Sequence, residues 1–307
     1  RVALCDGEGF MVAAMTVADK WQPDKQREAQ EIYGTTSTQH PGVRYLMEQV
    51  NDTYIGGEVT GAQLPIHTDF ETLRDTPEEL RHLFTKMGWQ NVVAFNTCKP
   101  MHRLQREITL QAAKQAQANI LLHPSVGMTK PGDLHYYARV HCYQAIKHHY
   151  PHHIAILSLL PSGVRMAGPR AVLLNAIMRQ NFGCSHMIVG PEHSAPPGVR
   201  DAEQRYYPRY AAQQMMEQHQ EELGIRMVPV RELCYSPDSE TFIPGDRQDT
   251  NCVRFNDRDL KHHIEHNIDI PTCYSYPEVS ASLHKVYPPR DKKGVTLFYT
   301  SLTGSGK

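Results

Sequence analysis

One short stretch of the sequence gathers side chains that could bind an anion. Lys99, His102, Arg103 and Arg106 supply positive charge or protons within it. A turn from a strand into a helix would point backbone N–H groups and the positive end of the helix at a ligand, and anions are the usual ligand of such a turn. The stretch therefore predicts an anion site, although a solvated basic start of a helix would show the same residues.

The residues around this stretch predict a strand, a tight loop and a helix. The apolar run at 92–95 is typical of a buried strand, and Pro100 ends any regular pattern after it. From Met101 to Ala112, apolar residues return at helical spacing. The basic residues are thus expected where a strand ends and a helix begins.

The alternation of strand and helix continues to about residue 230. Apolar runs predict further strands at 120–122, 154–157 and 187–190, and helices at 134–149 and 170–181. Upstream, Thr76 and Pro77 are expected to cap and begin a helix that runs to about Met87. This order is typical of an α/β fold with a doubly wound parallel sheet, in which ligands lie beyond the carboxyl ends of the strands.

The stretch that ends the first of these strands resembles the nucleotide-binding motif of ATP sulfurylases, Gln-x-Arg-Asn-Pro-x-His-x-x-His. The sequence keeps the proline and the first histidine as Pro100 and His102. Four other positions of the motif are changed, to Asn96, Cys98, Lys99 and Gln105. The resemblance extends over about residues 1–290, with its motifs in the family's order.

Two other loops are close to the family's form, at 123–133 and 164–170, and a third departs from it. In the third loop, 190–195, Pro191 stands where the family has an arginine. By the resemblance, Arg165 is expected to face the nucleotide. For Arg170, which begins a helix, a structural role is the alternative to nucleotide binding. The resemblance assigns catalysis to His102, Lys99 and Gln105, the sulfate pocket to Asn96, Cys98, Pro191 and Ser194, and nucleotide binding to Arg165, Gly190 and His193.

The family transfers the adenylyl group of ATP to sulfate, with Mg²⁺ on the pyrophosphate. The resemblance therefore implies ATP, sulfate and Mg²⁺ as ligands. Because both sulfate-binding arginines and one phosphate-binding histidine are replaced, the expected function is a scaffold whose sulfurylase activity is lost or strongly impaired. A working sulfurylase that uses Lys99 and Arg103 is the alternative, and a nucleotidylyltransferase with another acceptor is a third. Cys98 is expected to be a small buried side chain and not a nucleophile.

The end of the sequence carries a second signal. An apolar strand is expected at 295–300, and Ser301 then begins a loop that resembles the phosphate-binding P-loop. Its key residues are Gly304, Ser305, Gly306 and Lys307. This tail resembles the beginning of an APS kinase domain, which would bind adenylyl sulfate (APS) and phosphorylate it to PAPS; a flexible Gly/Ser tail is the alternative.

The expected domains follow from the same comparison. Residues 1–64 would end a β-rich PUA-like domain, 65–230 would form the α/β sulfurylase-like domain, 231–290 a C-terminal subdomain or linker, and 291–307 the start of the kinase domain. Because the sequence starts at Arg1 and stops within a motif, it is expected to be a piece of a longer polypeptide. The segment 34–43 is expected to form turns, and no catalytic role is assigned to its residues.

The composition limits the classes of partner that the protein is expected to bind. A formal net charge of -1 offers no basic excess for nucleic acid, and no apolar run is long enough to span a membrane. The seven cysteines are dispersed without CxxC spacing, which predicts reduced thiols in a cytoplasmic protein and no disulfides. Histidine pairs such as His148–His149 are adjacent, so no structural metal is expected. The protein is expected to form a homo-oligomer, a dimer or a hexamer.

Overall fold

The computed structural model describes residues 1–127, 134–196, 205–245, 251–255, 257–288 and 294. The chain divides into two compact units. The first contains Arg1–Cys98, Ile108–Pro131 and His152–Glu232, and the second contains Lys99–Glu107, Gly132–Pro151 and Leu233–Lys307. The domain boundaries expected from the sequence stay a prediction.

The first unit begins with a small antiparallel sheet. Its strands are β1 (Val2–Cys5), β2 (Met11–Trp21) and β3 (Tyr54–Gly61), in the order β1-β2-β3. The turn between β1 and β2 is closed by Asp6, whose side chain accepts hydrogen bonds from the backbone N–H groups of Glu8 and Phe10 at 3.0 and 2.9 Å. The expected β structure at the start of the chain is confirmed.

Two helices between β2 and β3 were not expected from the sequence. They are α1 (Lys25–Tyr33) and α2 (Pro41–Glu48). Helix α1 is charged on most faces, but Ala29 and Tyr33, four residues apart, bury one stripe of it. Helix α2 is capped by His40 and not by one of the usual N-cap residues, so the segment 34–43 lacks the ordinary signature of a helix start.

The five-stranded sheet of the first unit is parallel, as predicted. Its strands are β4 (Val92–Phe95), β5 (Asn119–Leu122), β6 (Ala155–Leu157), β7 (His186–Val189) and β8 (Arg226–Pro229). Their order is β6-β5-β4-β7-β8, so the earliest strand is central and the chain winds outward from it in both directions. Val92, Val93 and Ala94 are all buried, as expected for a parallel strand covered on both faces.

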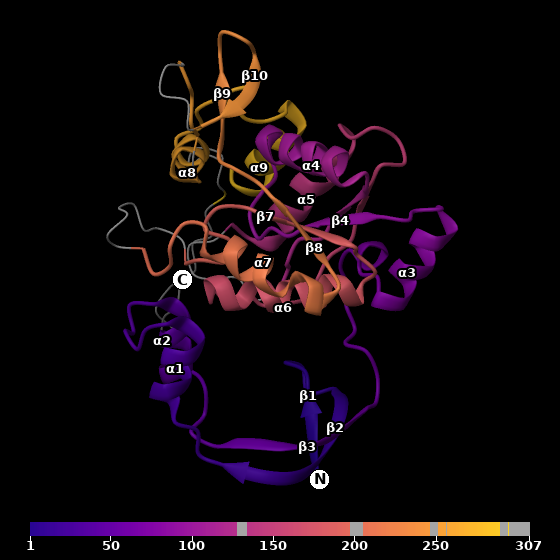
Figure 1. Ribbon diagram of the computed structural model, residues 1–307, viewed down its shortest axis with the longest axis vertical. Coiled ribbons are helices and arrows are strands. Elements are labelled where there is room, and N and C mark those ends of the chain that lie inside the picture. The colour runs from indigo at the N-terminus through magenta and orange to yellow at the C-terminus, as the bar shows by residue number, and fades with distance from the viewer. Residues whose placement is uncertain (128–133, 197–204, 246–250, 256, 289–293, 295–307) are drawn as a thin grey trace, which may run out of the picture. The chain divides into compact units, whose positions relative to one another are not determined.

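Helices α6 (Gly168–Asn181) and α7 (Ala211–Leu223) lie side by side along one face of this sheet (Figure 1). Helix α3 (Pro77–Lys86) and the short helix η1 (Glu71–Leu73) precede the sheet. The predicted start of α3 is confirmed by a capping box, because Thr76 and Glu79 exchange side-chain-to-backbone hydrogen bonds at 3.3 and 2.7 Å. The core on this face joins Leu80 and Phe84 of α3 to the strands and to α6 and α7.

The second unit is built around two packed helices. Its elements are α5 (Tyr136–Lys147), α8 (Asp257–Glu265), α9 (Pro277–Val286) and the hairpin of β9 (Leu233–Ser236) with β10 (Thr241–Pro244). Buried Cys142 and Tyr143 of α5 and Val279 and Leu283 of α9 lie at its centre. Helix α4 (Arg103–Ala116) is divided between the units, its residues up to Glu107 belonging to the second.

Two expectations about cysteine are wrong. Cys234 and Cys252 form a disulfide across 18 residues of sequence, so the thiols are not all reduced. Cys98 is exposed instead of buried, because it lies after the end of β4, where the chain leaves the sheet. Among the described residues, no helix is both long enough and apolar enough to cross a membrane.

Candidate functional site

Strands β4 and β7 define the place where a ligand is expected. They are neighbours and parallel, yet the chain leaves β4 toward β5 on one side and returns to β7 on the other. The loops that follow their carboxyl ends therefore diverge, and such a switch point is the usual ligand site of an open α/β sheet. Asn96 directly follows β4, and Gly190 directly follows β7.

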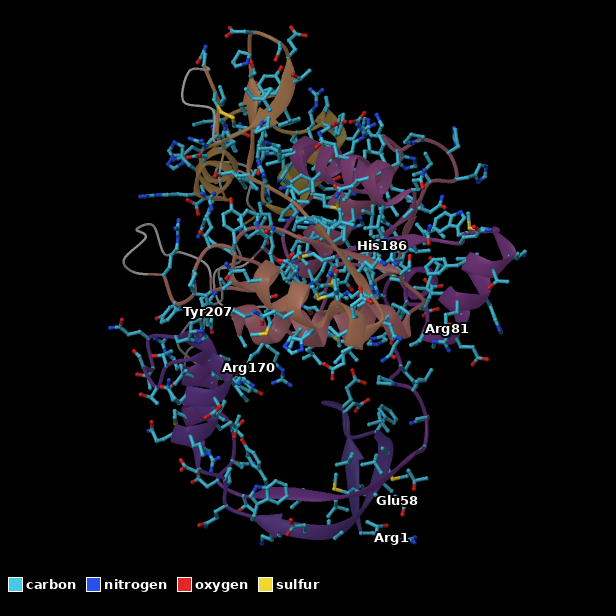
Figure 2. The ribbon with its side chains drawn as sticks, in the orientation of Figure 1. Arg1, Glu58, Arg81, Arg170, His186 and Tyr207 are labelled. Carbon is cyan, nitrogen blue, oxygen red and sulfur yellow. A yellow bond between two sulfur atoms is a disulfide. The ribbon has the colours of Figure 1, made fainter. Side chains whose placement is uncertain are left out.

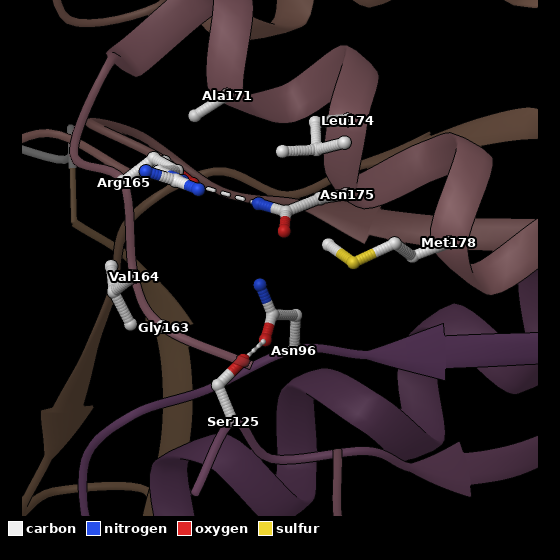
Figure 3. A pocket seen from close by; sticks show the side chains of 10 residues that line it. Asn96, Ser125, Gly163, Val164, Arg165, Ala171, Leu174, Asn175 and Met178 are labelled. Atoms are coloured by element: carbon white, nitrogen blue, oxygen red, sulfur yellow. Dashed lines mark hydrogen bonds between the residues drawn. The ribbon is translucent and has the colours of Figure 1, made fainter. Parts of the chain in front are cut away.

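A pocket lies at this position (Figure 3). Three predicted site residues, Asn96, Arg165 and Ser194, line it together. The remaining lining residues come from the loops after β5 and β6 and from α6: Ser125, Gly163, Val164, Ala171, Leu174, Asn175 and Met178. The cavity measures about 20 Å³, room for about one water molecule, so a nucleotide requires the surrounding side chains to move apart.

Hydrogen bonds connect the polar side chains of the pocket in pairs. Ser125 Oγ donates to Asn96 Oδ1 at 3.3 Å (Figure 3). Asn175 Nδ2 donates to Ser194 Oγ at 3.0 Å. The side chain of Arg165 is exposed, and no hydrogen bond or ion pair holds its guanidinium among the described residues. The pocket therefore offers neutral amide and hydroxyl groups together with one accessible positive charge.

A second arginine lies fully buried behind the pocket. Arg179 is 0% exposed; its guanidinium donates to Asn175 Oδ1 at 3.2 Å and to the carbonyl oxygen of His123 at 3.3 Å. Burial lowers the pKa of Arg179 to about 10, so the group remains charged at neutral pH. Because Asn175 is bonded to both Arg179 and Ser194, the buried charge helps to fix the wall of the pocket.

Two histidines near Arg179 are held in the neutral form. Burial, and then the charge of Arg179, lower the pKa of His193 to about 4 and that of His123 well below its usual value. The ring of His123 packs edge-on against Phe182, with centroids 4.6 Å apart. Both nitrogens of His123 and Nε2 of His193 are buried without a hydrogen-bond partner among the described residues. These histidines can therefore accept or donate a hydrogen bond as neutral groups but add no positive charge.

The other predicted residues of the first unit do not line the pocket. They are Cys98, Gly190, Pro191 and His193. Pro191 and Gly190 are partly exposed, and Cys98 is exposed. Their assignments to sulfate or nucleotide binding stay predictions.

The three predicted catalytic residues belong to the second unit. His102 is 1% exposed, its Nδ1 lies 2.9 Å from Ser275 Oγ, and its ring packs against Tyr274. Burial lowers its pKa to about 3, so it is neutral, whereas a positive or proton-donating group was expected. Gln105 accepts a hydrogen bond from the backbone N–H of His102 at 2.9 Å and so caps α4. The side chain of Lys99 is exposed.

The P-loop prediction, Gly304, Ser305, Gly306 and Lys307, lies outside the described residues. Within the described ranges, no group of three or more histidine, cysteine or carboxylate side chains is arranged to hold a metal ion.

Sequence reasoning missed several residues that build the pocket. Ser125 lies in a loop already close to the family's form but had no role of its own. Asn175 and Arg179 are the polar members of an otherwise apolar stripe on α6, four residues apart and thus one helical turn. A buried polar pair at that spacing is the signal that could have found them.

Comparison with known proteins fits this geometry. A model of the ATP-sulfurylase family matches residues 71–286, and a model of the PUA-like domain matches residues 1–64. The predicted fold class, an α/β doubly wound parallel sheet preceded by a PUA-like segment, is confirmed.

Two similar proteins are both named sulfate adenylyltransferase. The one from Phaeosphaeria nodorum is 43% identical over 310 aligned positions, covering 100% of this chain and 54% of that protein. The one from Schizosaccharomyces pombe is 42% identical and covers 97% of this chain and 61% of that protein. The chain thus spans little more than half the length of these relatives.

A solved structure is also similar. The chain matches a hexameric APS kinase from Thiobacillus denitrificans with a TM-score of 0.72 and 33% identity, over 99% of this chain and 52% of that one. The expectation of a scaffold without sulfurylase activity is wrong, because relatives 43% identical over the whole chain are named for that activity. The chain belongs to the ATP-sulfurylase family.

Proposed function

We propose that this chain carries the sulfurylase reaction, in which ATP and sulfate form adenylyl sulfate and pyrophosphate. A sulfate oxygen would attack the α-phosphorus, and the bond from that phosphorus to the bridging oxygen would break, so that pyrophosphate leaves with the electron pair. The observation that carries the proposal is the pocket at the β4–β7 switch point, where Asn96, Arg165 and Ser194 meet. The names of the relatives support the same reaction.

The pocket's chemistry suits two anionic substrates. Sulfate is fully ionised at neutral pH and can only accept hydrogen bonds, and Asn96 and Ser194 can donate them. Arg165 would contact the phosphates of ATP, since its guanidinium is accessible at the pocket. The buried charge of Arg179 and the positive end of α6 would stabilise the negative charge of the transition state without reorganising.

Magnesium would enter with ATP as part of the substrate. The ion would neutralise charge on the departing pyrophosphate. This chain's own residues would orient ATP and sulfate at the pocket.

The proposed reaction is tested by pyrophosphate release from ATP with and without sulfate. Release should depend on sulfate in the wild-type protein. Arg165→Ala should lower kcat/KM for ATP by about tenfold to a hundredfold, the effect of losing a charge-assisted hydrogen bond.

Arg170→Ala is the matched control. Arg170 (Figure 2) is an exposed arginine in the first turn of α6, close to Arg165 in the sequence, but it does not line the pocket. Its guanidinium lies 3.7 Å from the carboxylate of Glu31. Its kcat/KM should stay within about twofold of the wild type. Pyrophosphate release that is the same with and without sulfate would exclude the proposed reaction.

We further propose that residues 301–307 are a phosphate-binding loop of the APS-kinase type. The order of glycines and lysine in the sequence supports this, as does the name of the similar protein from Thiobacillus denitrificans. In the protein that carries this chain, Lys307→Ala should abolish formation of PAPS from ATP and adenylyl sulfate. An unchanged rate would exclude the assignment.

A homo-oligomer is proposed on the same basis, since that similar protein is named hexameric. Sedimentation equilibrium of the purified protein would give the mass of the assembly. A mass equal to that of one chain at micromolar concentration would exclude an oligomer of ordinary stability.

A further inference from the structure

His40 connects a helix of the N-terminal segment to a tyrosine far along the chain. It is 0% exposed, and its Nδ1 accepts hydrogen bonds from the backbone N–H groups of Gly42 and Val43 at 3.1 and 3.4 Å, which caps α2. Because Nδ1 accepts, the ring proton of the neutral imidazole must be on Nε2. That nitrogen lies 3.1 Å from the hydroxyl oxygen of Tyr207, to which it donates.

Tyr207 passes this connection to the loop that carries Arg165. Its hydroxyl donates to the carbonyl oxygen of Met166 at 3.4 Å. Burial raises the pKa of Tyr207 above its usual value, so the hydroxyl keeps the proton that it donates. Donors and acceptors therefore run in one direction, from His40 through Tyr207 to the residue next to Arg165.

The loop held in this way has a backbone that residues rarely adopt. Met166 has a φ of +56°, in the left-handed region that is unfavourable for a residue with a Cβ. Gly168 follows with a φ of +47°, and a Cβ there would lie 2.5 Å from the ring of Tyr207. The ring thus packs directly on the turn that leads from Arg165 into α6.

The N-terminal helices pack against the same turn. Ala29 and Tyr33 of α1 and Val43 of α2 form one buried cluster with Ala167 and Ala171. Burial raises the pKa of Tyr33 and the charge of Arg165 opposes that rise, as expected if the guanidinium lies near the ring. The segment before the parallel sheet therefore supports the loop on which Arg165 lies.

We propose that His40 and Tyr207 are positioning residues for ATP, which hold the turn at 166–168 so that Arg165 points to the nucleotide. This proposal rests on the proposed function, since it assigns Arg165 to ATP. Neither residue contacts the reacting atoms. The segment 34–43, which sequence analysis left without a catalytic role, thereby acquires an indirect one.

Tyr207→Phe tests the proposal, because it removes the hydroxyl that joins His40 to Met166 and keeps the ring on Gly168. We expect KM for ATP, and the dissociation constant for ATP from calorimetry, to rise about three- to tenfold, the effect of one hydrogen bond. The KM for sulfate and kcat should change by less than about twofold, since the chemistry is not touched.

Tyr206→Phe is the matched control. The ring of Tyr206 also packs on His40, at 4.6 Å between centroids, but no hydrogen bond of its hydroxyl occurs among the described residues. Its affinity for ATP should equal that of the wild type. The midpoints of thermal unfolding of both variants should be compared, so that a general loss of stability is recognised.

His40→Asn tests the other end of the connection. Asparagine can still cap α2 but is too short to reach Tyr207. Alone, it should weaken ATP binding as much as Tyr207→Phe does, and the double variant should be no weaker than either single one, because both changes break the same connection.

The outcomes separate this proposal from the proposed function. Unchanged ATP affinity in Tyr207→Phe overturns the positioning proposal. An equal rise in the KM for ATP and the KM for sulfate, together with a lower midpoint of thermal unfolding, also overturns it, because this result would show a merely structural role. Loss of sulfate dependence in the wild type, with ATP binding still sensitive to Tyr207→Phe, would exclude the sulfurylase reaction and leave the positioning role in place.

Discussion

Arg179 brings a positive charge into the interior. Its guanidinium donates to the side-chain and backbone carbonyls of Asn175 and to the carbonyl of His123, and among the described residues no carboxylate forms an ion pair with it. Burying a charge without a counter-ion costs several kcal/mol, so hydrogen bonds to Asn175 and to the His123 carbonyl are what compensate it. In return, the charge lies behind a pocket for anions, where a low dielectric strengthens its effect. The residue thus serves the pocket through Asn175 instead of facing the substrate.

Asn175→Ala should therefore destabilise the protein and disturb the pocket at once. Loss of Asn175 Oδ1 leaves the buried guanidinium short of an acceptor, which should lower the free energy of unfolding by about 1–3 kcal/mol in urea titrations. Ser194 loses its donor from Asn175, so sulfate-dependent turnover should also fall. Gln180→Ala, an exposed change on the same helix, is the control. Equal stability of the two variants would show that Asn175 does not compensate the charge.

At the scale of elements, the start of α6 organises the pocket. No side chain caps this helix, and the backbone N–H of Gly168 donates instead to the carbonyl oxygen of Ser194 at 3.1 Å. One hydrogen bond therefore joins the helix that carries Asn175 and Arg179 to the loop after β7. The ring of Tyr207 also packs on Gly168.

Gly168→Ala should be strongly destabilising for two separate reasons. The left-handed backbone costs a side chain about 1–2 kcal/mol, and the added Cβ would lie 2.5 Å from the Tyr207 ring, which must shift. The free energy of unfolding should fall by more than about 2 kcal/mol. Gly190→Ala, where nothing lies within 4 Å of the added Cβ, should change it by less than about 1 kcal/mol. Similar losses in both variants would refute this account of the turn.

At the scale of the whole molecule, histidines whose pKa is lowered by burial make stability depend on pH. Burial lowers the pKa of His102 to about 3 and of His193 to about 4, and His123 is lowered as well. In the unfolded chain these histidines take up protons as the pH falls below their ordinary pKa of 6.5. In the folded state they stay neutral until the pH reaches the lowered pKa values. Stability is therefore complete above about pH 6.5 and is lost as the pH falls toward 4 and then 3.

This loss can be assigned to single residues. His102 alone should account for about 2 kcal/mol of the decrease in unfolding free energy between pH 7 and pH 5. His102→Gln should flatten the dependence by that amount, and exposed His152→Gln should leave it unchanged. Urea titrations at both pH values measure the difference. A wild-type protein equally stable at pH 5 and pH 7 would contradict the predicted dependence.

The amino-acid sequence by itself determined that the sheet is parallel and that strands and helices alternate along the chain. The apolar run at 92–95 forms β4, and Thr76, Pro77 and Glu79 form the expected helix start, because strand burial and helix capping depend on neighbouring residues. The family's motifs also led to Asn96, Arg165 and Ser194, which share one pocket. The replacements at Cys98 and Pro191 led to the wrong expectation that sulfurylase activity is lost. A replaced residue shows which hydrogen-bond donor is missing, but not which other donors surround the pocket.

The tertiary structure decided everything that depends on residues far apart in the chain. His40 is hydrogen-bonded to Tyr207, 167 positions away in the sequence, and Arg179 to the His123 carbonyl, 56 positions away. Cys234 forms a disulfide with Cys252. No local pattern marks such pairs, because their free energy arises only when separate elements pack and exclude water. The same packing makes His102 neutral and buried, whereas its residue type alone suggested a proton donor.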